Sequence, residues 1–265
     1  MKFLFIVQGE GRGHFTQAIT LEEMLLRNGH EVVEVLVGKS STRTLPGFFN
    51  RSIHAPVKRF ISPNFLPTAD NKRANLTKSF AYNLLRLPEY LRSMYYINQR
   101  IRETGAEVVI NFYELLTGLT YALFRPSVPY ICVGHQYLFL HRDFEFPDKN
   151  SCQLWMLRFF TRMTALRSSK KLALSFLEME QDDMNQIVTV PPLIRQEVTA
   201  IRPEKGDNIH GYMVNSGFAD SVESFHAKHP EVPLTFFWDR SDAEEVTRID
   251  ETLSCLLYTS PSPRD

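Results

Sequence analysis

The sequence predicts an α/β protein made of two doubly wound units in tandem, of which the second is incomplete. Three observations carry this prediction. A strand, a helix and a second strand follow one another at the N-terminus, and such a βαβ unit predicts a parallel sheet. The same order of elements begins again after the pair Pro191-Pro192, where helix and sheet both end. Only 61 residues run from Lys205 to the C-terminus, too few to cover both faces of a second sheet.

The elements can be assigned in order from apolar runs and turn residues. Short apolar or β-branched runs predict strands at 3–7, 31–37, 57–62, 108–112, 129–133, 171–176 and 188–190. Helical spacing predicts helices at 16–27, 75–104 with an interruption at Pro88, 115–124 and 151–167, and 63–74 has the composition of a loop. The second unit begins with a strand at 208–214, a helix at 217–228 and a strand at 233–238. The predicted bounds are therefore 1–190 for the first domain, 191–204 for a linker and 205–254 for the second domain.

The composition is that of an ordinary globular protein. The chain has 265 residues, of which 43% are hydrophobic and 23% charged, and this excludes wholesale disorder. A net charge of zero argues against a nucleic-acid partner held by global charge. Three well-separated cysteines argue against a disulfide scaffold or a cysteine zinc site and fit a reducing cytoplasm. The first apolar stretch is too short for a signal peptide, and no stretch has the length of a membrane span.

The zero net charge conceals one basic block. Residues 39–102 hold 12 basic and 2 acidic side chains, whereas 1–38 and 103–265 are both net acidic. Aromatic residues are interspersed among these charges: Phe48, Phe49, Phe60, Phe65, Phe80, Tyr82, Tyr90, Tyr95 and Tyr96. One interpretation is a basic and aromatic surface that binds an anionic membrane or an anionic acceptor. The alternative is that the aromatic residues belong to the core and the charges solvate helix faces.

The most informative segment is the glycine-rich stretch 9–14, GEGRGH, between the first strand and the first helix. Glycines there allow close approach to a ligand, and a helix N-terminus favours a phosphate or a developing anion. The spacing differs from the dinucleotide pattern G-x-G-x-x-G. We single out His14 as a candidate general base, because an imidazole can take up a proton near neutral pH. A histidine that only hydrogen-bonds locally at the helix start fits the pattern equally well.

The predicted topology brings further loops to the same place. With a strand order 3-2-1-4-5, the order reverses between strands one and four, and ligands bind beyond the carboxyl ends of such strands. We expect Glu114 to orient His14 or to bind a substrate hydroxyl, and Thr117, His135 and Gln136 to line the same cleft. A carboxylate at a helix start is also favoured by the helix dipole alone. His135 and Gln136 are also compatible with an ordinary polar turn.

Several segments together resemble a known family. The opening FIVQGEGRGHFTQAITLEEMLLRNGHEV resembles the N-terminus of GT-B glycosyltransferases. The likeness is greatest to the bacterial family-28-type enzymes, which include the lipid-linked N-acetylglucosaminyltransferases of peptidoglycan synthesis. Their histidine-bearing glycine loop and later G-H-x-V strand correspond to 9–14 and 29–32. The stretches VVINFYELLTGLTYALFRPSVPYICVGHQ, 191–195 and GYMVNSGFADSVESFHAKHPEVPLTFFWD are similar to later parts of the family, so the resemblance covers about residues 1–254. The family's paired glycines are replaced here by Arg12-Gly13.

The resemblance implies a GT-B fold of two Rossmann-like doubly wound domains, an acceptor-binding domain at 1–190 and the start of a donor-binding domain at 205–254. It implies an inverting, metal-independent hexosyltransferase that uses a UDP-sugar donor, a hydroxyl-bearing and lipid-linked acceptor, and no cofactor. It also implies a cytoplasmic protein at the inner face of the cell membrane. His14 and Glu114 would be catalytic, with substrate-binding residues Gly11, Arg12, Gly13, Thr117, His135 and Gln136, donor-binding residues Ser216 and Gly217, and no metal ligands.

The C-terminal end departs from the family. In the family, the loops that contact uridine and diphosphate come after the point where this chain stops. Residues 255–265, CLLYTSPSPRD, resemble translated sequencing-adaptor sequence. We therefore expect a truncated chain with an artefactual tail and no catalytic activity of its own.

Two other hypotheses stay open. One is a UDP-sugar 2-epimerase of the same fold, because fold does not settle function. The other is a membrane-surface binding module built on the basic block.

Overall fold

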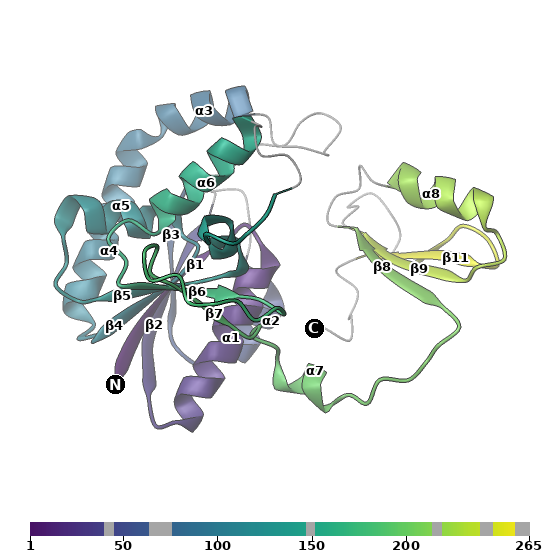
Figure 1. Ribbon diagram of the computed structural model, residues 1–265, viewed down its shortest axis with the longest axis horizontal. Helices are drawn as coiled ribbons and strands as arrows, with labels where there is room; N and C mark the ends of the chain where they lie inside the picture. The colour runs from purple at the N-terminus through teal and green to yellow at the C-terminus, as the bar shows by residue number, and fades with distance from the viewer. Residues whose placement is uncertain (40–44, 64–75, 147–151, 214–218, 239–245, 258–265) are drawn as a thin grey trace. The chain divides into compact units, whose positions relative to one another are not determined.

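The computed structural model describes residues 1–39, 45–63, 76–146, 152–213, 219–238 and 246–257 (Figure 1). Its contacts divide the chain into two compact units. One consists of residues 1–64 and 83–199, and the other of residues 65–82 and 200–265. The first unit continues past position 190 because α7 (Gln196–Ala200) follows its last strand. There the Arg27 guanidinium donates a hydrogen bond to the Gln196 side-chain oxygen at 3.0 Å.

A parallel sheet of seven strands forms the centre of the first unit. The strands are β1 (Lys2–Gln8), β2 (Glu31–Lys39), β3 (Val57–Ile61), β4 (Val108–Phe112), β5 (Tyr130–Val133), β6 (Lys170–Leu174) and β7 (Ile187–Val190). Their order is β3-β2-β1-β4-β5-β6-β7, and every neighbouring pair is parallel. The predicted reversal of order between the first and fourth strands is confirmed. Each of the seven predicted strands is confirmed with ends that differ by two residues or fewer.

Helices cover both faces of this sheet (Figure 1). One face carries α1 (Arg12–Arg27) and α2 (Gly47–Ser52), and the other carries α4 (Leu87–Glu103), α5 (Leu115–Phe124) and α6 (Cys152–Thr164). Strand β1 shows why both are needed. Phe3, Phe5 and Val7 pack with α1, whereas Leu4 and Ile6 pack with α4 and α5. Alternate side chains point to opposite faces, so a strand that is apolar throughout must be covered twice.

Helix α6 ends three residues before its predicted end, and two other predicted helices differ more from the observed ones. Helix α1 begins at Arg12 instead of position 16, because the backbone is extended only as far as Gly11 (φ −116°). His14 therefore lies inside the first turn of the helix. The predicted helix 75–104 is two helices, α3 (Leu76–Leu85) and α4, and the chain breaks at Arg86. Pro88 is the second residue of α4, a position where its missing N–H removes no helical hydrogen bond. The short helices α2, α7 and η1 (His135–Leu140) were not predicted, since six residues or fewer give no clear periodicity.

The second unit holds a sheet of four strands in the order β10-β11-β9-β8. Strand β8 (Ile209–Met213), helix α8 (Ala219–Lys228) and strand β9 (Leu234–Trp238) confirm the predicted β–α–β beginning. Strands β10 (Val246–Arg248) and β11 (Leu253–Leu257) were not predicted. Because β11 pairs with β9, Cys255 packs with Leu234 in the core of this unit. Residues 258–265 lie outside the described residues, and an artefactual tail at 255–265 stays a prediction.

None of the helices described here combines the length and the apolar character that a bilayer crossing requires.

Candidate active site

His14 occupies the carboxyl edge of the sheet, where the order of strands reverses. Its side chain is 6% exposed. The Gln136 amide nitrogen lies 3.3 Å from His14 Nε2. An amide nitrogen can only donate, so Nε2 accepts this hydrogen bond through its lone pair and the ring proton sits on Nδ1. Within the described residues, neither Nδ1 nor the buried Gln17 Oε1, one turn further along α1, has a hydrogen-bond partner. The imidazole therefore lies between two glutamine side chains.

The surroundings keep this imidazole neutral. The pKa of His14 is lowered to about 4, first by burial and then by the charge of His135, while the Gln17 side chain acts in the opposite direction. His14 thus has an available lone pair at neutral pH, which is the state that a general base needs. The Tyr113 ring stacks on the imidazole, with ring centroids 5.8 Å apart and planes inclined by 19°.

Glu114 is placed differently from what the sequence predicts. It is fully buried and caps the N-terminus of α5, where its Oε1 accepts hydrogen bonds from the Leu116 N–H (3.1 Å) and the Ser62 hydroxyl (2.5 Å). Its Oε2 lies against Gly38, where a Cβ would come within 2.3 Å. Among the described residues no hydrogen bond joins Glu114 to His14, because the carboxyl group is turned toward the ends of β2 and β3. Burial raises the pKa of Glu114 to about 7, and the Ser62 hydrogen bond partly offsets this effect.

The glycine-rich loop passes very close to the end of β2. The Gly9 N–H donates to the Gly38 carbonyl oxygen at 2.7 Å, and a Cβ on Gly9 would lie 2.6 Å from the same oxygen. Gly9 therefore allows a close backbone approach, whereas a Cβ on Gly38 would meet the side chains of Glu114 and Phe60. Gly11 is the N-cap of α1, so no side chain caps the N-terminus of this helix. Gly13 is exposed, and a Cβ there would meet nothing within 4 Å.

The other predicted residues are distributed as follows. Gln136 contacts His14, His135 is exposed beside it, and Arg12 is partly exposed in the first turn of α1. Thr117 is buried in α5, and its hydroxyl has no partner among the described residues. The predicted donor residues Ser216 and Gly217 lie outside the described residues.

Three site residues were missed from the sequence. Gln17 lies three positions after His14, so helical spacing was a signal for it. Ser62 follows the third strand, the kind of position that was singled out after strands one, four and five. Asn111 sits inside the apolar strand β4, where its side-chain oxygen accepts from the Glu114 N–H at 2.9 Å and its amide donates to the Thr164 carbonyl at 2.9 Å.

A cavity of about 510 Å³ opens beside this site. Its polar lining includes Gln17 and His135, both of which influence the pKa of His14. The apolar lining residues are Leu138, Leu174, Phe176, Leu177, Pro192 and Leu193. Such a cavity can hold an apolar molecule and direct its polar group toward the few polar side chains.

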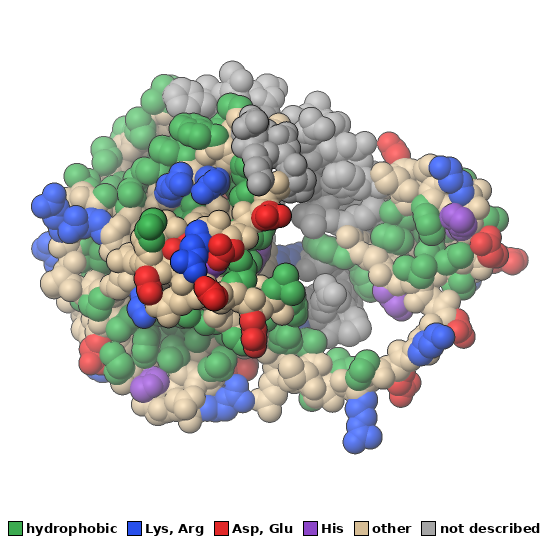
Figure 2. Space-filling model, viewed as in Figure 1, with side chains coloured by type: hydrophobic (Ala, Val, Ile, Leu, Met, Phe, Trp, Pro, Cys, Tyr) green, Lys and Arg blue, Asp and Glu red, His purple; other side chains and the backbone are tan. Residues whose placement is uncertain are grey.

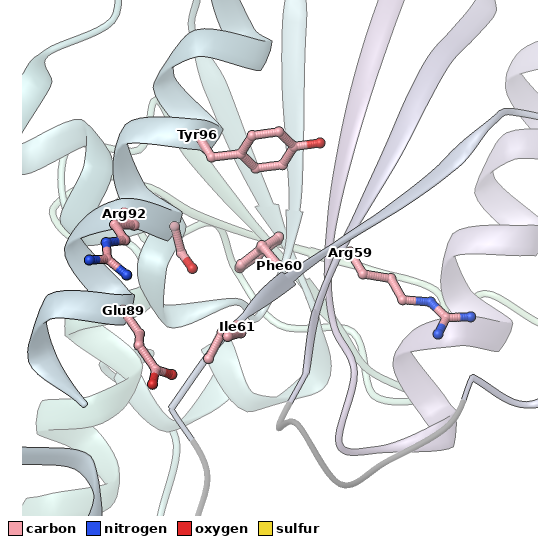
Figure 3. Close-up of a pocket in the computed structure, with 7 residues that line it drawn as sticks. Arg59, Phe60, Ile61, Glu89, Arg92 and Tyr96 are labelled. Carbon is pink, nitrogen blue, oxygen red and sulfur yellow. The ribbon is translucent and has the colours of Figure 1, made fainter. Parts of the chain in front are cut away.

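A second pocket, of about 270 Å³, lies between β3 and α4 (Figure 3). The guanidinium groups of Arg59 and Arg92 point away from each other, while Phe60 and the ring of Tyr96 lie between them (Figure 3). Glu89, at its rim, forms an ion pair with Arg86 at 2.6 Å. The charged groups therefore do not converge on a common ligand position.

Groups of three or more His, Cys, Asp or Glu side chains placed for a metal ion do not occur in the part of the chain that the structure describes.

Comparisons with known proteins assign this architecture to a family. The model of the family described as glycosyl transferase family 1 matches residues 1–249. No curated protein matches the chain significantly in sequence. The fold is similar to that of UGT2 from Phytolacca americana, solved with UDP-2fluoro-glucose and pterostilbene (TM-score 0.60, 12% identity, 98% of this chain and 72% of that chain). It is also similar to UGT89C1 from Arabidopsis thaliana, solved with UDP-L-rhamnose (TM-score 0.56, 14% identity, 97% of this chain and 69% of that chain). A third similar fold is that of the glycotransferase of kitacinnamycin (TM-score 0.56, 14% identity, 96% of this chain and 70% of that chain).

These solved structures show the fold alone at such low identity, and the narrower likeness to family-28-type enzymes stays a prediction. The family match, by contrast, spans nearly the whole chain. The chain belongs to glycosyl transferase family 1 and has the α/β architecture of the GT-B glycosyltransferases.

Proposed function

We propose that this chain is the acceptor-binding domain, with the first part of the donor-binding domain, of an inverting glycosyltransferase that uses a UDP-sugar. The observation that carries the proposal is the buried, neutral His14 beside a largely apolar cavity at the carboxyl edge of β1. Family membership supports the reaction class. Two solved structures of the same fold are complexes with UDP-2fluoro-glucose and with UDP-L-rhamnose, which supports the choice of donor.

In this proposal His14 takes the proton of the acceptor hydroxyl. The hydroxyl replaces the Gln136 amide as the hydrogen-bond donor to His14 Nε2. As the acceptor oxygen forms its bond to the anomeric carbon, its proton passes to Nε2, and the bond between that carbon and the diphosphate oxygen breaks. The electron pair of that bond leaves with the UDP, and attack from the opposite side inverts the configuration. Helix N-termini stabilise the diphosphate charge, so that the reaction proceeds without a metal ion.

The lining of the cavity supports the choice of acceptor. Six of its nine lining residues are apolar, which suits an acceptor that has an apolar body and a single hydroxyl directed to His14. A lipid-linked acceptor has this character. The low pKa of His14 makes it a weak base, and such a base acts best when proton transfer accompanies attack on a good leaving group.

Contact with a membrane is a further part of the proposal, on a surface that differs from the predicted one. Most described aromatic residues of the basic block are buried or partly buried, including Phe48, Phe49, Phe60 and Tyr90, so they do not form an aromatic surface. Tyr95 is the exception among them, at 63% exposure. It belongs to a row of exposed residues at four-residue spacing on α4, together with Leu87 and Leu91.

Two further exposed rings lie on α6, which neighbours α5 on the same face of the sheet. The rings of Trp155 and Phe159 stack with centroids 5.3 Å apart. Hydrophobic side chains gather over α5 and α6 at the upper left of Figure 2, with Lys and Arg among them. Such a surface favours a bilayer that contains anionic lipid. Sedimentation with vesicles that is equal for neutral and anionic lipid, or unchanged by Leu91→Ser with Tyr95→Ser, would count against membrane contact.

The catalytic proposal is tested on a chain that is extended in frame through the donor domain. His14→Gln in that enzyme should lower kcat by roughly 10²-fold or more. The control is His229→Gln, which changes an exposed histidine directly after α8 and should leave kcat unaltered. If His14→Gln keeps the full kcat, His14 is not the base. The 265-residue chain itself should neither transfer nor hydrolyse UDP-glucose. An epimeric UDP-sugar formed from the donor alone would replace the transferase with the 2-epimerase.

A further inference from the structure

The ring of Tyr113 stacks on His14 and is itself held in place by other side chains. The two rings are nearly parallel, at 19°, with centroids 5.8 Å apart. Tyr137 packs edge-on against Tyr113 at 5.7 Å, and Phe160 of α6 packs against it at 5.6 Å. The Tyr113 side chain is therefore fixed on several sides, and one face remains for the imidazole.

The Tyr113 hydroxyl is anchored to α6. It lies 2.8 Å from Thr161 Oγ1. The Thr161 hydroxyl already donates its own hydrogen to the Leu157 carbonyl at 2.8 Å. A hydroxyl has only one hydrogen, so Tyr113 must be the donor and Thr161 the acceptor. Burial raises the pKa of the Tyr113 phenol, which keeps that hydrogen in place. The position of α6 thus sets the position of the ring that contacts His14.

The backbone at Tyr113 is strained in a way that the side chain explains. Its φ is +61°, in the left-handed region that residues other than glycine rarely adopt. The other described non-glycine residues with positive φ are Arg125, Arg167 and Gln186, and all three are exposed. Tyr113 alone of the four is buried, directly after β4 and before the cap of α5. Glycine would fit this backbone with less strain, so the ring itself is the reason for tyrosine here.

We propose that Tyr113 is a positioning residue, whose ring fixes the plane of the His14 imidazole and stabilises the imidazolium that His14 becomes when it takes up a proton. The inference rests on the proposed role of His14 as a base. A base histidine is commonly oriented by a carboxylate, but among the described residues none is bonded to either ring nitrogen of His14. The negative face of an aromatic ring attracts a cation and is most effective where water is excluded.

The charged groups around the pair are few. On η1, His135 lowers the pKa of His14 by its charge. At the N-cap of α5, the Glu114 carboxyl is turned away toward Ser62. On α6, the residues that touch Tyr113 are the neutral Phe160 and Thr161. Besides the Gln17 side chain, the Tyr113 ring is therefore the contact that we expect to favour the protonated imidazole.

The test uses the full 265-residue chain with isotope-labelled histidine, observed by NMR. The His14 signals are identified by their loss in His14→Gln. Tyr113→Phe keeps the ring, whereas Tyr113→Met fills similar space without an aromatic face, and both leave the same backbone strain. Tyr95→Met is the control for loss of an exposed tyrosine. The aromatic ring at position 113 displaces the NMR chemical shifts of the His14 ring protons. This displacement should remain in Tyr113→Phe and disappear in Tyr113→Met. Titration between about pH 3 and pH 7 should show a proton affinity roughly tenfold lower in Tyr113→Met than in Tyr113→Phe.

Equal displacement in the two variants, or a His14 pKa in Tyr113→Met that is equal to or higher than that in Tyr113→Phe, would overturn the proposal. If Tyr113→Met does not fold, Thr161→Val replaces it, since this variant keeps the ring and removes its anchor. It should then broaden the His14 signals and lower its proton affinity, and unchanged signals would overturn the proposal. None of these measurements needs turnover. Failure of the base assignment, seen as an active His14→Gln enzyme, is therefore distinguishable from failure at Tyr113.

Discussion

His14 and Glu114 should make opposite contributions to the pH dependence of stability, and replacing either one should reveal the other. Burial raises the pKa of Glu114 from 4.5 to about 7, so the folded chain keeps this proton when the unfolded chain has lost it. The free energy of unfolding therefore falls as the pH rises from 4.5 to 7. Burial lowers the pKa of His14 from 6.5 to about 4, so the free energy of unfolding falls as the pH drops from 6.5 to 4.

The two effects are similar in size. Each pKa differs from its ordinary value by about 2.5 pH units, and one unit corresponds to about 1.4 kcal/mol, so each group contributes about 3 kcal/mol. In the wild-type chain the two slopes cancel between pH 4.5 and 6.5. In Glu114→Gln the free energy of unfolding should rise with pH across this range. In His14→Gln it should fall with pH, and the double variant should again show little pH dependence from this pair.

The assay is equilibrium urea unfolding at several pH values, followed by the amide NMR signals of β1 and β4. These strands belong to the first unit alone, so the transition does not mix the two units. The slope with pH is the quantity to compare, because the substitutions also change stability by a constant amount. A Glu114→Gln chain whose pH profile has the same slope as the wild type would refute the reasoning for Glu114, and the corresponding result for His14→Gln would refute it for His14.

Three further substitutions test the packing. Gly118→Ala should cost about 2 kcal/mol, because its Cβ would lie 2.1 Å from a backbone carbonyl of α6; an unchanged urea midpoint would contradict this. Arg100→Met should also cost about 2 kcal/mol, because it removes two hydrogen bonds, at 2.8 and 2.9 Å, from the buried Glu34, and adding Glu34→Gln should restore part of the loss. Asp250→Asn should speed amide exchange in β11. The hydrogen bond with His226, then those with backbone N–H groups, lowers the pKa of Asp250, so its stabilisation is present above about pH 4 and lost below it. Equal exchange rates in the variant and the wild type at neutral pH would argue against a stabilising role of the Asp250 carboxylate.

Much of the fold could be predicted because its signals are local. Strand β4 is a run of apolar and β-branched residues between turn residues, and both of its predicted ends are confirmed. Gly29, in the left-handed conformation, marks the end of α1 within two residues. Strand β10 was missed because it has only three residues, and β11 was missed because its residues from Cys255 onward were assigned to an artefactual tail.

The site could be predicted only in part, because its properties come from distant residues. The glycine-rich loop identified His14, but its burial and low pKa depend on contacts with Gln136 and His135, more than a hundred residues away. For Glu114, the sequence predicted its place at the start of a helix but not the direction in which its carboxyl group points. That direction is set by Ser62, which directly follows β3, and by the missing side chain of Gly38 in β2.

The place of β1 in the sheet has a consequence for synthesis. Residues Phe3 to Val7 are made before the other strands of this sheet and are almost completely buried in the finished sheet. Their neighbour on one side, β2, follows within about thirty residues, but Phe3 pairs on its other side with Val108 of β4. At roughly 5–20 residues per second, a ribosome needs on the order of ten seconds to make the chain between them. During that time an apolar strand edge has no partner. The nascent chain should therefore be a substrate for chaperones that bind extended apolar segments, until β4 emerges and closes the centre of the sheet.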